Sequence, residues 1–87
     1  MKLIITIIPK NDCDTVSLAL TERKFRVTQI ASTGGFLRKG NATLLVGVED
    51  EQLDEALGVI KETVDKSNNK QKGVLFVIKV DKCYTLS

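Results

Sequence analysis

The stretch KLIITIIP, residues 2–9, decides the fold of this chain. Five of its eight residues are leucine or isoleucine, and they fall on both sides of an extended backbone. Such a continuous apolar run predicts a buried strand. The run is too short to span a membrane, and no small-residue cleavage site follows it. We therefore expect a cytoplasmic protein that makes no contact with a membrane.

Two amphipathic segments outside this strand predict helices. The first begins at Asn11 or Asp12, whose side-chain oxygen would cap it, and ends near Lys24. The second begins at Asp50 and Glu51, where negative charge suits a helix N-terminus. Apolar residues at spacings of three and four give each helix one core face. These residues are Cys13, Val16, Ala19 and Leu20 in the first helix, and Leu53, Ala56, Leu57, Ile60 and Val64 in the second.

Three further strands complete the pattern. Residues 25–32 alternate between two faces, whereas residues 42–48 and 74–80 are apolar on both faces. A polar loop, KSNNKQK, precedes the last strand. The order β-α-β-β-α-β predicts the ferredoxin-like α+β fold, with a four-stranded antiparallel sheet and both helices on one face. We expect residues 1–87 to form a single domain.

The apolar content of the strands exceeds what this fold buries in one copy. Two short helices cover only one face of the sheet, so the other face would expose a large apolar patch. Burying even a few hundred Å² of it would contribute several kcal/mol, at about 25 cal/mol per Å². We expect this face to meet other copies of the chain. The alternative is a register error at one strand.

Composition excludes several kinds of function. The 87 residues include no histidine and only two cysteines, and the chain has a net charge of +2. These values argue against zinc sites, histidine-based catalysis and a nucleic-acid polymer as partner. The carboxylates cluster at helix starts, where capping explains them. We expect no enzymatic activity, metal or cofactor. We expect Cys13 and Cys83 to be free, mostly packed thiols, although a disulfide between them stays open.

The connection ASTGGFLRKGN, residues 31–41, contains apolar and basic residues beyond the turn residues that a hairpin requires. Gly34 and Gly35 either form a turn or let backbone N–H groups approach a phosphate. Phe36 and Leu37 lie at the tip, where water should reach them. They either fold back onto the core or form an apolar surface on which a purine base stacks.

Five residues outside the tip of this connection are further candidates for a ligand site. Arg26 and Thr28 share a strand face and would reach a phosphate, unless Arg26 is simply solvated. Asn41 offers a donor and an acceptor to an adenine edge, or serves as a left-handed turn residue. Gly47 inside a strand indicates a bulge or a close approach to the backbone. Phe76 is most simply a core residue.

The motif TGGFLR followed by GN, with FRVT before it and VLFVIKVD near the end, resembles the cyclic di-AMP receptor proteins of Gram-positive bacteria, which are PII-like trimers. The similarity covers nearly all of the chain. It implies a non-enzymatic sensor that binds cyclic di-AMP between subunits of a homotrimer. Binding would order the loop 33–41 and change which effector protein the trimer accepts. The ligand-binding residues that the resemblance implies are Arg26, Thr28, Gly35, Phe36, Leu37, Asn41, Gly47 and Phe76.

The chain also departs from that family. The loop 66–73 is much shorter, the tail 82–87 is less aromatic, and Lys24 replaces an asparagine. These changes bear on affinity, base selectivity and contact with an effector. Two alternatives therefore stay open, a PII-like trimer that binds ATP or ADP and an interaction module that has lost ligand binding. An RNA-binding module fits less well, because the chain has only one Tyr and three Phe.

Overall fold

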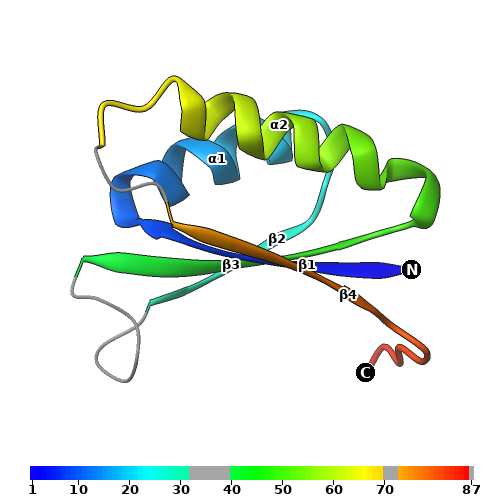
Figure 1. Ribbon diagram of the computed structural model, residues 1–87. Coiled ribbons are helices and arrows are strands. Elements are labelled where there is room, and N and C mark those ends of the chain that lie inside the picture. Colours follow the sequence, from blue (N-terminus) through cyan, green and yellow to red (C-terminus); the bar gives the residue numbers. More distant parts are fainter. Residues whose placement is uncertain (32–39, 70–72, 87) are drawn as a thin grey trace.

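The structure is a computed structural model that describes residues 1–31, 40–69 and 73–86. Its strands form one antiparallel sheet in the order β2-β3-β1-β4, and both helices lie on one face of it (Figure 1). This arrangement confirms the predicted ferredoxin-like α+β order. The elements are β1 (Lys2–Pro9), α1 (Lys10–Glu22), β2 (Val27–Ala31), β3 (Asn41–Val48), the 3-10 turn η1 (Asp50–Gln52), α2 (Leu53–Asp65) and β4 (Val74–Lys79).

The start of α1 differs from the prediction. The helix begins at Lys10 with Pro9 as its N-cap, so neither Asn11 nor Asp12 caps it. The backbone N–H of Lys10 instead donates to the carbonyl of Gly40 at 2.8 Å. A tertiary contact thus satisfies a donor that the sequence pattern had assigned to a side-chain cap.

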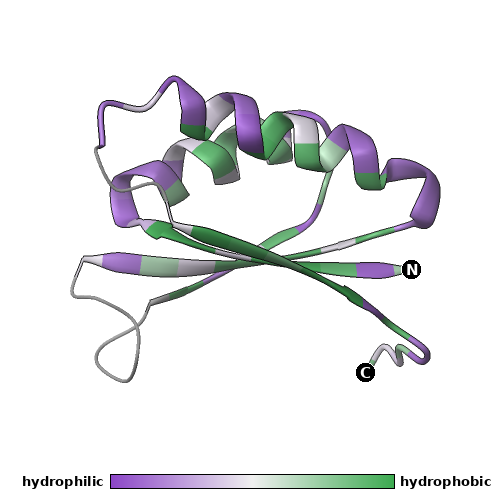
Figure 2. Cartoon of the chain, in the orientation of Figure 1, coloured by the Kyte–Doolittle hydropathy of each residue, from purple (hydrophilic) through white to green (hydrophobic). Residues whose placement is uncertain are grey.

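The core lies between the sheet and the helices. Alternate residues of β1 and β3 point toward the helices, and the cross-strand pairs Ile4–Val46 and Ile8–Ala42 are almost fully buried. Figure 2 shows hydrophobic residues along most of each strand, whereas the helices alternate between hydrophobic and hydrophilic positions. The predicted helix faces are confirmed, but Val59 of α2 belongs to the core as well.

The other side of the sheet is the open face, which neither helix covers (Figure 1). The prediction that apolar residues line both sides of the sheet is confirmed for the single chain. Phe76 is 52% exposed and Ile78 46%, since β4 is an edge strand. The register assigns to the open face Leu3, Ile5 and Ile7 of β1, Thr28 and Ile30 of β2, Asn41, Thr43, Leu45 and Gly47 of β3, and Val74, Phe76 and Ile78 of β4.

The two cysteines are free and lie in different surroundings. Cys13 is buried in α1, and its burial raises the pKa of the thiol to about 11. Cys83 is exposed, so of the two free thiols, which were predicted to be mostly packed, only Cys13 is packed. No helix in the described part of the chain is long and apolar enough to cross a bilayer.

Thr6 of β1 places a hydroxyl in the core. The residue is 1% exposed, and its Oγ1 has no hydrogen-bond partner. An unpaired buried hydroxyl costs about 1–3 kcal/mol. We therefore expect Thr6→Val to raise the free energy of unfolding by about 1 kcal/mol, or the Tm by about 4–8 °C. Thermal unfolding monitored by circular dichroism measures this, with Thr43→Val on the open face as control. A lower Tm for Thr6→Val would show that the hydroxyl is satisfied.

Candidate functional site

The open face brings predicted site residues from three strands together. Phe76 of β4 lies opposite Ile5 of β1, Ile5 opposite Leu45 of β3, and Leu45 opposite Thr28 of β2. These four residues form one row across the sheet. Asn41 and Gly47 of β3 share the same face, at either end of the strand. The described residues of the predicted site that lie within strands are therefore all on the surface that the helices leave uncovered.

Thr28 and Phe76 lie on opposite edge strands. The row between them crosses three strand spacings, or about 14 Å at 4.7–4.9 Å each. That separation is large for two side chains that hold one base between them. One copy of the chain therefore brings these residues to the same face without bringing them into contact.

Arg26 directly precedes β2 rather than lying within it, which corrects the predicted strand boundary. Its neighbour Phe25 is buried, and the N–H of Phe25 donates to the carbonyl of Leu20 at 3.1 Å. The backbone beside Arg26 is thus fixed by the core. The Arg26 side chain is exposed and forms no ion pair with any residue that the structure describes.

Asn41 is the first residue of β3 and is half-buried opposite Pro9. The interpretation of Asn41 as a left-handed turn residue is wrong. The positive φ at this turn, +90°, belongs to Gly40, and among the described non-glycine residues only Lys24 has one. Backbone geometry therefore does not account for asparagine at position 41.

Gly47 lies within a regular ladder opposite Leu3, so the predicted bulge is wrong. A Cβ at this position would meet no atom within 4 Å. Glycine usually weakens a strand interior, and here the subunit itself gives no reason for it. The other half of the prediction, a close approach by something outside the subunit, stays a prediction.

We expect Gly47→Val to keep the fold and to block any molecule that approaches the backbone at this position. A β-branched residue suits an extended strand, so the Tm should equal or exceed that of the unmodified protein. Any cyclic di-AMP that approaches this backbone, as the resemblance implies, should bind at least about tenfold more weakly, a loss of roughly 1.4 kcal/mol. Isothermal titration and thermal unfolding of the same sample separate the two effects. Unchanged affinity would show that nothing approaches the backbone at Gly47.

Phe76 is not a core residue, because half of its surface is exposed on the open face. Gly35, Phe36 and Leu37 lie outside the described residues, as does Gly34. Within the described ranges, no three histidine, cysteine, aspartate or glutamate residues lie close enough together to hold a metal ion.

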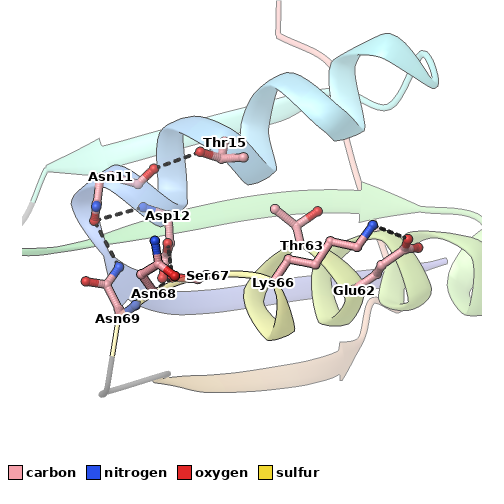
Figure 3. Close-up of a pocket in the computed structure, with 9 residues that line it drawn as sticks. All are labelled: Asn11, Asp12, Thr15, Glu62, Thr63, Lys66, Ser67, Asn68 and Asn69. Carbon is pink, nitrogen blue, oxygen red and sulfur yellow. Dashed lines mark hydrogen bonds and ion pairs between the residues drawn. The ribbon is translucent and has the colours of Figure 1, made fainter.

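Sequence reasoning missed one polar cluster on the helix side of the molecule. Asn11 and Asp12 of α1 meet Ser67 and Asn69, which follow α2 (Figure 3). The Ser67 hydroxyl donates to Asp12 at 2.7 Å across 55 residues of sequence. The segment containing Ser67 and Asn69 was predicted only as a polar loop, and no local signal in it indicates this contact.

The fold resembles that of a solved protein along nearly its full length. A crystal structure of a functionally unknown protein from Pediococcus pentosaceus superposes with a TM-score of 0.81. Its sequence is 29% identical, and the match covers 98% of this chain and 96% of that one. The pattern that defines the cyclic-di-AMP receptor family matches residues 1–78. This match extends from β1 into β4, and the chain therefore belongs to the cyclic-di-AMP receptor family.

Proposed function

We propose that this protein is a non-enzymatic receptor that binds cyclic di-AMP between the subunits of a homotrimer. The observation that carries the proposal is the open face, where Thr28, Asn41, Gly47 and Phe76 lie on a surface that neither helix covers. Membership of the cyclic-di-AMP receptor family supports the ligand. No covalent step is required of any residue.

The positions of the edge strands support a site between subunits. In a closed ring of identical copies, one surface of each copy contacts a different surface of the next. In this proposal, the β2 edge of one copy lies near the β4 edge of its neighbour. Arg26 and Thr28 would face Phe76 of the next copy, so that residues far apart in one chain line a shared cleft.

The residue types suit a ligand with two phosphates and two adenines. The Arg26 guanidinium would donate paired hydrogen bonds to phosphate oxygens. The Asn41 amide offers both a donor and an acceptor to an adenine edge. Phe76, with Phe36 and Leu37, would supply apolar surface for the bases. In this proposal, binding orders the loop 33–41 and changes the surface presented to an effector protein.

Titration of the purified chain tests the ligand class. We expect saturable binding of cyclic di-AMP by isothermal titration, and weaker or no binding of cyclic di-GMP and ATP. Stronger binding of ATP would favour the PII-like nucleotide alternative. Saturable binding of none of the three would remove the receptor proposal and leave an interaction module that has lost its ligand.

Arg26→Ala should weaken cyclic di-AMP binding at least about tenfold, because a hydrogen bond to a charged group contributes about 1.5–3 kcal/mol. Without ligand, its stability should change by less than about 0.5 kcal/mol, as is usual for an exposed side chain. Arg23→Ala is the matched control. Arg23 is also exposed, and it pairs with Glu55 at 3.5 Å outside the proposed site. Its replacement by alanine removes the same charge. Equal affinity in the two variants would contradict the role of Arg26.

A further inference from the structure

Lys24 has a backbone conformation that lysine rarely adopts. Its φ is +69°, and no other non-glycine residue in the described part of the chain has a positive φ. Lys24 directly follows Arg23, the C-cap of α1. Its N–H donates to the carbonyl of Thr21 at 2.9 Å, and the N–H of Phe25 donates to that of Leu20 at 3.1 Å. These two hydrogen bonds form a Schellman motif, which requires a left-handed residue at position 24.

The end of α1 does not account for a lysine at position 24. Glycine or asparagine is usual there, because most side chains in the left-handed region strain the backbone. The C-terminal dipole of a helix attracts a cation, but that gain is smaller than the cost of a left-handed residue. Arg23 already places a positive charge at this helix end. Residues held in strained conformations are frequent in binding sites, so the lysine points to such a role.

The Lys24 side chain is within reach of a group that Arg26 binds. Phe25, which lies between them, is buried in the core, whereas Lys24 and Arg26 are both exposed. The connection that holds them runs from the helix layer to the edge strand β2 (Figure 1). Their Cα atoms are at most about 7 Å apart, because only one residue separates them. Lysine carries its ammonium on a flexible four-carbon stem, so the two cationic groups can meet at one ligand.

The charges of residues 23–26 favour an anionic ligand. Arg23, Lys24 and Arg26 are all positive, and Arg23 pairs with Glu55 at 3.5 Å. Lys24 and Arg26 form no ion pair with any residue that the structure describes, and we call these two residues the cation pair. Like charges at this separation repel each other, and an anion bound between them removes the repulsion.

We propose that Lys24 is a further phosphate-binding residue of the dinucleotide site, where its ammonium and the Arg26 guanidinium bind one phosphate together. Arg26 donates paired hydrogen bonds that fix the orientation of the phosphate, whereas Lys24 acts as a point charge. The strained lysine thus lowers the stability of the free protein and raises its affinity for the ligand. This inference rests on the proposed function, because the dinucleotide supplies the phosphate.

Lys24→Gly tests the inference, because it should change stability and affinity in opposite directions. Without ligand, the Tm should rise by roughly 4 °C, since glycine adopts a positive φ without strain. Cyclic di-AMP should bind at least about fivefold more weakly by isothermal titration, because a charge-assisted contact is lost. The affinity should also depend less on the salt concentration than it does in the unmodified protein.

Two further variants serve as controls. Lys24→Arg keeps both the positive charge and the strained backbone, so its Tm and its affinity should stay close to those of the unmodified protein. Lys61→Gln removes the same charge from an exposed position of α2, on the helix side of the sheet. Its affinity for cyclic di-AMP should be unchanged, which separates a local contact from the effect of net charge.

Unchanged affinity or a lower Tm in Lys24→Gly would overturn the inference and leave the receptor proposal intact. If the unmodified protein does not bind cyclic di-AMP, the receptor proposal fails instead. An NMR titration with inorganic pyrophosphate then tests the cation pair alone. Saturable shifts at residues 24–26 that Lys24→Gly abolishes would support a phosphate site. Equal shifts in both proteins, or none in either, would contradict it.

Discussion

Gly73→Ala is expected to destabilise the protein by more than about 3 kcal/mol, the largest effect of any single substitution argued from this structure. Gly73 has a φ of +108°, and an alanine in that region costs about 1–2 kcal/mol by itself. Its Cβ would also overlap the carbonyl oxygen of Ile7 and lie 2.8 Å from Cγ2 of Ile8. Overpacking of this kind adds about 1–3 kcal/mol. Both neighbours belong to the central strand β1, so the backbone there has little room to move.

Two other glycines provide graded controls. Gly40 has a φ of +90° but open space around a Cβ, so Gly40→Ala should lose only the conformational term of about 1–2 kcal/mol. Gly58 lies in α2 with open space and no positive φ, so Gly58→Ala should stabilise the protein by about 0.5–1 kcal/mol. Urea unfolding of the three variants gives the order directly. If the urea midpoint of Gly73→Ala were close to that of Gly40→Ala, the β1 backbone would be able to move and accommodate the added Cβ.

The connection that ends at Gly73 shows where sequence reasoning stopped. The polar composition of KSNNKQK predicts a short loop. Its packing depends on partners far away in sequence, because Ser67 bonds to Asp12 and Gly73 lies against Ile7. Contacts of this kind have no periodic signal, so only the folded chain reveals them.

Both helices and β2 were predictable because each has a repeat of its own, and the other strands because they are continuous apolar runs. The alternation of residues 25–32 and the helical spacing of Val16 and Leu20 follow from side-chain direction in each element. The N-terminus of α1 was not predictable in the same way. Its first donor bonds to Gly40, which a side-chain capping rule does not consider.

The candidate site was predictable in part for the same physical reason. Residues that alternate along β3 share a face, so Asn41 and Gly47 fall together once the strand is recognised. The exposure of Phe76 was not predictable from its own strand. It follows from the position of β4 at the edge of the sheet, which is a property of the topology.

The second large effect is expected from Phe76→Asp, which should convert the proposed trimer into a monomer. Phe76 is 52% exposed at the β4 edge of the open face. A carboxylate buried there without a partner would cost several kcal/mol per subunit. Sedimentation at micromolar concentration should change from three times the chain mass of 9.6 kDa to a single chain. Cyclic di-AMP binding should fall with it, because the proposed cleft needs two copies.

Val77→Asp is the matched control for this experiment. Val77 is the next residue of β4, is 40% exposed and lies on the helix side of the sheet opposite Ile4. The Val77→Asp substitution introduces the same charge into the same edge strand. Any general weakening of β4 should therefore appear in both variants. If the open face joins the copies, only Phe76→Asp should dissociate them. If the unmodified protein sediments as a stable, folded monomer, the open face does not join copies, and Arg26 and Phe76 lose their common cleft.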